Sequence, residues 1–322
     1  MNPYRRYAER AAALSHAALR HALYRLHGML HEAVTIQTAQ GRLTMSTRDD
    51  GIAAALFRWR QYEYAYSLDA LRFLKSAGFL PREHVCMLDV GANIGVISTG
   101  LLLANEIESA VAIEPEPRNF ELLLKNIEQN GLAARARCLQ MALGEGQATL
   151  TMELSPSNPG DHRIRVAPTA DATELQNESL RRTVQVQSLT LKQIVELPEV
   201  RDLARAKPSL LWIDVQGYEG YVFSGGNDVL GVGMPAVSEV WPYGIHRAGM
   251  SLQTFESVVR SVWSDYWVYR RNRFVRYPIS AFGRFLDELG SDGYFENVIL
   301  TKGSSAVTNE AIADARSAPS AP

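Results

Sequence analysis

The stretch MLDVGANIG, residues 87–95, decides the fold. It begins as an apolar run that contains one acid, Asp89, and Gly91 and Gly95 then frame a turn that leads into a helical pattern. Glycines at such a turn let a ligand approach the main chain, and the start of the following helix offers free N–H groups. We therefore predict a strand, a turn and a helix that together bind a nucleotide-like cofactor.

Outward from this stretch, apolar runs alternate with helical patterns. Buried parallel strands read as nearly continuous apolar runs, and helices between them cover both faces of the sheet. We therefore predict an α/β protein with a doubly wound sheet. The apolar runs occupy 85–90, 109–114, 136–143, 209–214, 235–241 and 294–300, and the helical patterns occupy 93–104, 116–130, 217–230 and 251–262.

The turn itself indicates which cofactor binds. A dinucleotide site needs the pattern G-x-G-x-x-G, which brings the backbone against a pyrophosphate, and this turn has only Gly91 and Gly95. The carboxylate of Asp89 would repel a pyrophosphate but suits an ammonium group. S-adenosylmethionine carries an ammonium and a sulfonium, and we predict it as the cofactor.

The next two strands supply further candidates for cofactor binding. Glu114 ends the second strand, 25 positions after Asp89, and one carboxylate can accept hydrogen bonds from both ribose hydroxyls. Met141 and Ala142 end the third strand, and their position predicts contact with the adenine.

Residues 147–188 interrupt the alternation as an insertion, with strands expected at 147–154 and 183–188 and a polar loop at 155–180. Long loops in compact domains are usually functional or disordered. We expect this loop to lie over an acceptor pocket and to bind the acceptor through Asn158, Asp161, His162 and Arg163.

The N-terminal part has a different organisation. Residues 1–34 contain a long amphipathic helix, 35–80 form a strand-turn and helical lead-in with a turn at Gln40-Gly41, and 81–302 form the catalytic domain. The Ser-, Ala- and Pro-rich residues 303–322 are predicted to be a disordered tail. We expect the helix to pack on its own domain or on a second copy as a homo-oligomer; contact of its basic side with a membrane surface is the alternative.

Composition excludes several classes of protein. Thirty-three Lys and Arg against 35 Asp and Glu give a net charge of -2, so no global field favours nucleic acid or an anionic membrane as partner. Cys86 and Cys138 both lie in apolar runs, which argues against a disulfide framework and fits a reducing compartment. Four of the seven histidines lie in residues 16–31 without a third ligand at metal spacing. No apolar run is long enough for a membrane span, and we expect a cytoplasmic location.

Six segments together resemble the FkbM-type methyltransferases, over about Tyr62 to Lys302. The resemblance implies a Rossmann-like fold, methylation of hydroxyls on sugars or polyketides, an aromatic-acid pair at Tyr62-Glu63 near the cofactor, and binding roles for the turn residues. The chain departs from the family at Trp212, where Lys is usual, and at Pro159, where Ser is common. The six segments are LDVGANIG (88–95), AIEPEPRNFELLLKNIEQN (112–130), MALGEGQATL (141–150), NPGDHRI (158–164), WIDVQGYE (212–219) and FENVILTK (295–302). The residues to which the resemblance gives cofactor-binding roles are Asp89, Gly91, Asn93, Gly95 and Glu114.

Methyl transfer to a hydroxyl requires positioning and a group that accepts the hydroxyl proton. Asp214 and Glu239 are candidates because they end strands at the sheet edge where ligands bind. His162 is a candidate because of its ordinary pKa. Helix capping, ion pairing or solvation are the structural alternatives for these residues, and the two carboxylates are an alternative Mg²⁺ site. The rival functions are a nicotinamide oxidoreductase and a non-catalytic cofactor-binding protein that recruits partners.

Overall fold

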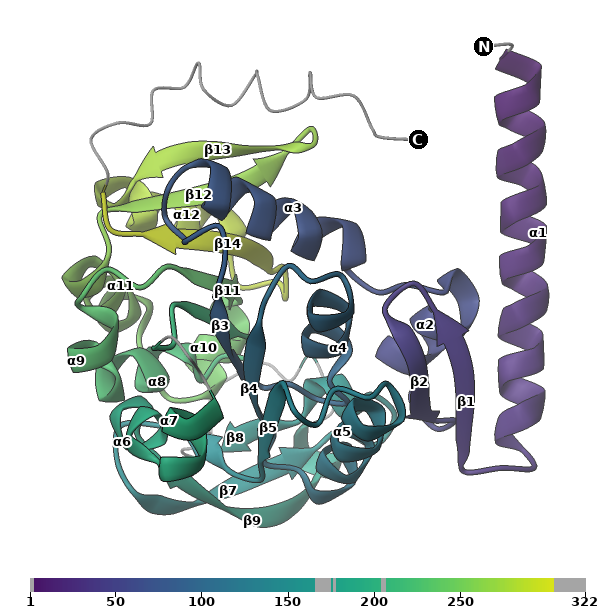
Figure 1. Cartoon of the computed structure of the whole chain (residues 1–322), viewed down its shortest axis with the longest axis horizontal. Helices are drawn as coiled ribbons and strands as arrows, with labels where there is room; N and C mark the ends of the chain where they lie inside the picture. Colours follow the sequence, from purple (N-terminus) through teal and green to yellow (C-terminus); the bar gives the residue numbers. More distant parts are fainter. Residues whose placement is uncertain (1–2, 166–174, 176–177, 204–206, 304–322) are drawn as a thin grey trace.

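The structure, a computed structural model of the chain, describes residues 3–165, 175, 178–203 and 207–303, and for residues 3–15 the backbone only. The predicted tail, apart from Gly303, and part of the predicted polar loop at 155–180 lie outside the described residues. Figure 1 shows one large sheet covered by helices, with a long helix at the outer edge of the molecule.

The large sheet has eight strands in the order β13-β12-β14-β11-β10-β3-β4-β5. The five strands from β11 to β5 are parallel, and the other three are antiparallel additions at one edge. The predicted α/β class is confirmed. The strands are β3 (Cys86–Val90), β4 (Ser109–Ile113), β5 (Ala136–Leu139), β10 (Leu210–Ile213), β11 (Ala236–Val240), β12 (Asp265–Arg270), β13 (Arg273–Pro278) and β14 (Glu296–Thr301).

Alternate residues of the central strands pack on opposite faces, as the two-residue period of a strand requires. On β10, Leu211 and Ile213 join one apolar core, whereas Leu210 and Trp212 join the other. The first core is covered by α6 (Leu191–Glu196), α7 (Pro198–Leu203), α8 (Glu219–Gly225), α11 (Leu252–Val262) and α12 (Phe282–Leu289), and the second by α3 (Tyr64–Ser76), α4 (Val96–Leu103) and α5 (Pro117–Gln129).

Two predicted elements are divided in the structure. The apolar run 136–143 forms β5 and then a separate short strand, β6 (Ala142–Leu143), which belongs to another sheet. The helical pattern 217–230 forms α8 and α9 (Asn227–Leu230), which meet at Gly226. Further helical segments are α10 (Pro242–Arg247) and η3 (Ile279–Ala281).

The insertion forms a second sheet in the order β6-β9-β7-β8. The strands predicted at 147–154 and 183–188 are confirmed as β7 (Ala148–Leu154) and β9 (Arg182–Leu189). The segment between them is not all loop, because it contains η1 (Pro159–Asp161), β8 (Arg163–Arg165) and η2 (Glu178–Leu180).

The N-terminal part contains α1 (Pro3–Gly28), the hairpin β1 (Ala33–Thr38) and β2 (Gly41–Ser46), and α2 (Ile52–Trp59). The turn predicted at Gln40-Gly41 is confirmed. Asn126 of α5 joins the hairpin to the domain, since its Oδ1 accepts from the Thr44 N–H at 2.7 Å and its Nδ2 donates to the Ile94 carbonyl at 2.8 Å. Among the described residues, no helix combines the length and the apolar character that crossing a membrane requires.

Candidate cofactor and acceptor site

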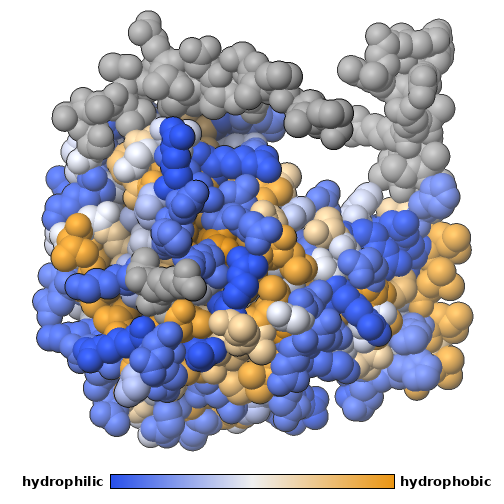
Figure 2. All heavy atoms as spheres, viewed as in Figure 1, coloured by the Kyte–Doolittle hydropathy of each residue, from blue (hydrophilic) through white to orange (hydrophobic). Residues whose placement is uncertain are grey.

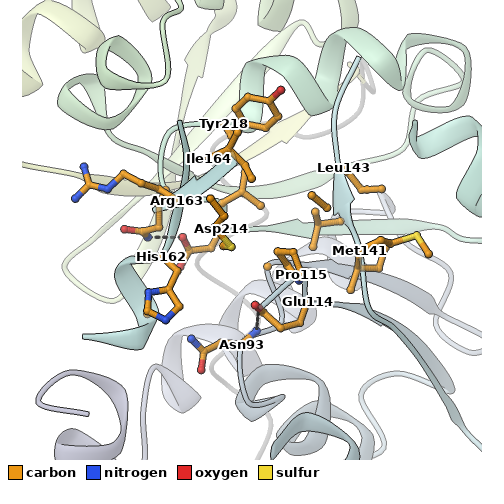
Figure 3. Close-up of a pocket in the computed structure, with 18 of the residues that line it drawn as sticks. Asn93, Glu114, Pro115, Met141, Leu143, His162, Arg163, Ile164, Asp214 and Tyr218 are labelled. Atoms are coloured by element: carbon orange, nitrogen blue, oxygen red, sulfur yellow. Dashed lines mark hydrogen bonds between the residues drawn. The ribbon is translucent and has the colours of Figure 1, made fainter. Parts of the chain in front are cut away.

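A cavity lies where the carboxyl ends of β3, β4 and β10 meet the insertion sheet. Figure 3 shows side chains from both sheets around it. The predicted site residues that line this cavity are Gly91, Asn93, Glu114, Met141, Ala142, His162, Arg163 and Asp214; Tyr62, Glu63, Asp89, Gly95, Asn158, Asp161 and Glu239 do not line it.

Gly91 is required by backbone packing. Its φ is 82°, and a Cβ there would lie 1.9 Å from the carbonyl oxygen of Asp214. The turn after β3 therefore packs directly against the end of β10. The sequence pattern predicted a glycine that lets a ligand approach the backbone. In the structure, glycine is required here because the backbone of Asp214 lies close to it. Gly95, with φ 79°, plays a similar part, because its Cβ would lie 2.5 Å from Leu123 Cδ1.

Glu114 is a buried carboxylate on the wall of the cavity, with 4% of its surface exposed. It accepts hydrogen bonds from the backbone N–H groups of Asn93 and Glu116, both at 2.9 Å. Burial raises the pKa of Glu114 to about 8, and the backbone bonds oppose that rise. Since a carboxylate has about four acceptor positions, Glu114 retains acceptor capacity for two further hydroxyls.

Asp89 lies on the face of the sheet behind the turn. On β3 it has the same parity as Met87, which packs in the core that α3 and α4 cover. Its carboxylate, 2% exposed, accepts from the Ser98 hydroxyl of α4 at 2.5 Å, and burial raises its pKa to about 6. Asp89 therefore holds α4 against the turn and is not among the residues that line the cavity, and its expected contact with an ammonium group stays a prediction.

Tyr62 and Glu63 are held by Gln40 of the hairpin turn. The Gln40 Oε1 accepts from the Tyr62 N–H at 2.8 Å, and its Nε2 donates to the Tyr62 carbonyl at 2.9 Å. They line a separate concavity of about 680 Å³. Desolvation and the Asp214 carboxylate raise the pKa of Glu63 to about 7. The pair predicted near the cofactor thus lies near Asp214 and away from Glu114.

A hydrogen-bonded group joins Asp214 and Glu239 at the ends of β10 and β11. The side-chain amide of Gln216 donates to Asp214 Oδ1 at 2.6 Å and to Glu239 Oε1 at 3.1 Å. Desolvation raises the pKa of Asp214, and desolvation followed by the Asp214 and Glu219 charges raises that of Glu239 well above its usual range. The sequence predicted that the two acids lie at the same edge of the sheet, but no sequence pattern indicated that Gln216 bridges them.

Glu219 is a further acid that sequence reasoning missed. Its Oε1 accepts from the backbone N–H groups of Val215 and Gly217 at 3.0 and 3.3 Å, so it holds the loop that carries Asp214. Its position as the first residue of α8 is typical of an ordinary helix-start acid, so the sequence alone does not indicate this role.

His162 faces the cavity but is a poor proton acceptor. Its Nδ1 accepts from the Ser155 backbone N–H at 3.0 Å, so in the neutral ring the proton lies on Nε2. Burial, followed by the Arg181 charge, lowers the pKa of His162 to about 4. The ring therefore presents a hydrogen-bond donor to the cavity, and the geometry contradicts its prediction as the general base.

The other predicted acceptor-binding residues of the insertion pair with each other. Arg163, only 4% exposed, contacts Asp161 at 2.8 Å and Glu178 at 3.4 Å, and its guanidinium lies 5.0 Å from the Trp241 ring centroid. Asp161 also pairs with Arg181. Ion pairs among these side chains compensate their buried charges, and Arg163 also lines the cavity, so the predicted binding of the acceptor by Asp161 and Arg163 stays a prediction.

Asn158 caps η1. Its Oδ1 accepts from the Gly160 N–H at 3.2 Å, and it does not line the cavity. The next residue, Pro159, accepts through its carbonyl from the side-chain amides of Asn93 and Asn119, both at 3.3 Å. The segment therefore forms a wall of the cavity. Asn158 stabilises the turn that forms this wall, whereas the sequence predicted that it contacts the acceptor.

Comparison with protein families identifies the domain in which this cavity lies. Residues 89–241 match the family model described as the Methyltransferase FkbM domain. The chain carries an FkbM methyltransferase domain. The matched segment begins at Asp89 and ends at Trp241, so it includes Glu114, Asp214 and Glu239. The cofactor of such methyltransferases is S-adenosylmethionine, and an apolar wall beside Met141 with the buried Glu114 carboxylate fits its adenosine.

Individual relatives of the FkbM domain are distant. Methyltransferase sdnD of Sordaria araneosa is 27% identical over 156 residues, which are 43% of this chain and 59% of that protein. The chain thus matches less than two thirds of this relative. A crystal structure of Methyltransferase FkbM from Methylobacillus flagellatus has a TM-score of 0.39 at 14% identity and covers 77% of this chain and 53% of that one. A putative transferase of Pyrococcus horikoshii has a TM-score of 0.39 at 12% identity, covering 85% and 73%.

Metal ligands do not gather in this FkbM domain. Across the residues for which the structure gives positions, no group of three or more His, Cys, Asp or Glu side chains is arranged to hold a metal ion.

The raised pKa of Glu114 predicts a pH-dependent stability for the protein without cofactor. Between the ordinary pKa of 4.5 and about 8, the folded state keeps a proton that the unfolded state has released. The free energy of unfolding should therefore fall as pH rises through this window, by up to about 1.4 kcal/mol per pH unit from this group. Urea unfolding from pH 5 to 8 measures the slope, which should be shallower in Glu114→Gln than in the wild type. Glu145→Gln changes an exposed carboxylate and is the control; equal slopes in all three proteins would contradict the assignment.

Proposed function

We propose that this chain is an S-adenosylmethionine-dependent O-methyltransferase that acts on a hydroxyl of a sugar, a glycan or a polyketide-type small molecule. The FkbM domain supports methyl transfer. The division of the cavity supports the placement of donor and acceptor, because an apolar end at Met141 and Leu143 lies opposite a polar end at Asp214 and Gln216.

The residues at the apolar end are suited to hold the donor's adenosine. Met141, Ala142 and Leu143 offer an apolar wall for the adenine, and Glu114 offers acceptor positions for the ribose hydroxyls. When bound, S-adenosylmethionine supplies a methyl group activated by its sulfonium.

The observation that carries the proposal is the Asp214–Gln216–Glu239 group at the polar end. Asp214 lines the cavity, and Gln216 ties it to the buried Glu239. As the acceptor oxygen forms its bond to the methyl carbon and the carbon–sulfur bond breaks, the hydroxyl proton has to leave. A carboxylate with a raised pKa is a suitable acceptor, because proton transfer is most efficient when the pKa approaches the working pH. We assign this role to Asp214 and the role of positioning it to Glu239.

Binding of the cofactor product, S-adenosylhomocysteine, tests the proposed donor site. We expect S-adenosylhomocysteine to bind the wild type and to bind Glu114→Ala about 10- to 150-fold more weakly, since a hydrogen bond to a charged group contributes about 1.5–3 kcal/mol. Isothermal titration calorimetry measures both affinities, with Glu145→Ala as the exposed control. Equal affinity in the folded variants would refute the ribose assignment. Binding of NAD in preference to S-adenosylhomocysteine would support an oxidoreductase.

Methyl transfer to candidate acceptors tests the proposed acceptor class. The wild type is incubated with methyl-labelled S-adenosylmethionine and a panel of monosaccharides, oligosaccharides and hydroxylated polyketides. Mass spectrometry should find a product that has gained one labelled methyl group on oxygen. Tight cofactor binding with labelled methyl only on nitrogen or carbon acceptors would contradict O-methylation, and binding without any product would favour the non-catalytic alternative.

A further inference from the structure

The outward face of α1 and of the turn that follows it is apolar. Five large apolar side chains there are exposed: Leu19 by 59%, Leu23 by 48%, Leu26 by 56%, Met29 by 80% and Leu30 by 74%. In Figure 2, hydrophobic residues follow the edge of the molecule that α1 forms in Figure 1. Contiguous exposed apolar surface of this kind marks an interaction site.

This face is held outward by contacts on the opposite side of the helix. Tyr24 is fully buried, and its single hydroxyl proton is shared between the Ser46 and Asp49 carbonyl oxygens, which lie 2.9 and 2.7 Å away. Arg25 pairs with Asp50 at 2.8 Å. Rotation of α1 to bury its leucines would break these contacts, so the apolar face is available to a partner.

Basic and aromatic residues accompany the apolar face. The sequence of α1 contains five arginines and one glutamate, a formal charge of +4, in a chain whose net charge is -2. The Arg20 guanidinium donates to the Arg58 carbonyl of α2 at 3.3 Å. The next residue, Trp59, is 46% exposed and lies 5.3 Å from the Arg58 guanidinium. An amphipathic helix with a basic side and neighbouring tryptophan is the pattern of an interfacial helix on anionic lipid.

Two features of this face disfavour a second copy of α1 as the partner. Leu19, Leu23, Leu26 and Leu30 follow coiled-coil spacing, with steps of four, three and four residues. This seam covers about 17 Å of helix, however, which is shorter than the three or more heptads that identify a coiled coil. In addition, two helices that each carry a charge of +4 repel each other, whereas the same charge is attracted to anionic headgroups.

We propose that the outward face of α1 binds the surface of an anionic lipid bilayer, with the helix parallel to the membrane plane and the FkbM domain on the aqueous side. The leucines enter the boundary between headgroups and acyl chains, and the positive charge of the helix as a whole attracts it to the anionic headgroups. The proposal concerns peripheral binding and is independent of the acceptor.

Sedimentation with vesicles tests this proposal on the full chain. We expect binding to vesicles of phosphatidylcholine with phosphatidylglycerol and at least about tenfold weaker binding to phosphatidylcholine alone, with loss of binding as salt screens the charges. Leu23→Glu combined with Leu26→Glu should lower binding to the anionic vesicles at least about tenfold. The matched control is Val232→Glu with Leu180→Glu, which changes two apolar side chains that are 84% and 75% exposed.

Calorimetry with S-adenosylhomocysteine and circular dichroism establish that each variant is folded. Equal binding of wild type and the Leu23/Leu26 variant to anionic vesicles would overturn the proposal, as would the absence of vesicle binding by the folded wild type. A dimer seen by light scattering that the Leu23/Leu26 substitutions dissociate, without vesicle binding, would assign the face to self-association.

Discussion

Replacing Gly91 with alanine should prevent formation of the native site, with a loss of more than about 4 kcal/mol in the free energy of unfolding. The alanine Cβ would lie 1.9 Å from the Asp214 carbonyl oxygen, and both groups belong to backbone at the centre of the sheet. No side-chain rotation can relieve this overlap. The positive φ of 82° adds about 1–2 kcal/mol of strain for an L-residue. Urea unfolding measures the loss, and an insoluble product would agree with it.

Gly131→Ala is the matched control for this experiment. Gly131 has a φ of 70°, and a Cβ there would meet no atom within 4 Å. It should lose only the strain of the positive φ, about 1–2 kcal/mol. If Gly91→Ala were no more destabilising than Gly131→Ala, the contact between the turn and the end of β10 would be wrong.

Asp214→Asn should lower kcat by about 10²- to 10⁴-fold, the range expected for loss of a general base. Asparagine has nearly the same shape as aspartate and can still meet Gln216, so the fold should be preserved. Glu239→Gln removes a charge one hydrogen bond further away and should have a smaller effect, together with a shift in the pH profile of kcat. Steady-state kinetics on the acceptor found by mass spectrometry, with circular dichroism for folding, measures these effects.

His162→Ala separates the two candidate bases. Because the His162 Nδ1 accepts from the Ser155 N–H and its pKa is about 4, we expect kcat to fall by about tenfold or less. The Michaelis constant for the acceptor should rise if the Nε2–H group orients it. If His162→Ala lowered kcat more than Asp214→Asn does, His162 and not Asp214 would be identified as the general base.

The sequence predicted the parallel core because its signals are local and repeated. The turn at 91–95, the acid at Glu114 and the acids at the ends of β10 and β11 each follow from an apolar run and the residue that ends it. The strands β12 and β13 were missed, since their sequences DYWVYR and RFVRYP mix aromatic and charged residues without a clean period. Of these two strands, only β13 is an edge strand with mostly exposed or half-exposed residues, whereas β12 lies between β13 and β14 and is largely buried.

The sequence predicted the directions in which individual side chains point less well than it predicted the strands and helices. Asp89 was placed in the cavity because it precedes the turn, but the parity of β3 directs it toward Ser98. The burial of Arg163 depends on Glu178 and Trp241, residues from η2 and from the end of β11. Such partners follow from tertiary packing, which motif spacing does not encode.

Pro159, His162 and Met152 of the insertion line the same cavity as Glu114 and Asp214, so under the proposed function the insertion contributes to donor binding as well as to acceptor binding. The insertion sheet is therefore not an exchangeable module. Grafting the corresponding segment from another methyltransferase to change acceptor choice would also replace part of the donor-binding surface and remove the Pro159 carbonyl that receives the amides of Asn93 and Asn119. For the proposed acceptor site, we therefore expect single substitutions around Asp214, on the segment that follows β10, to change acceptor choice with less damage to the cavity.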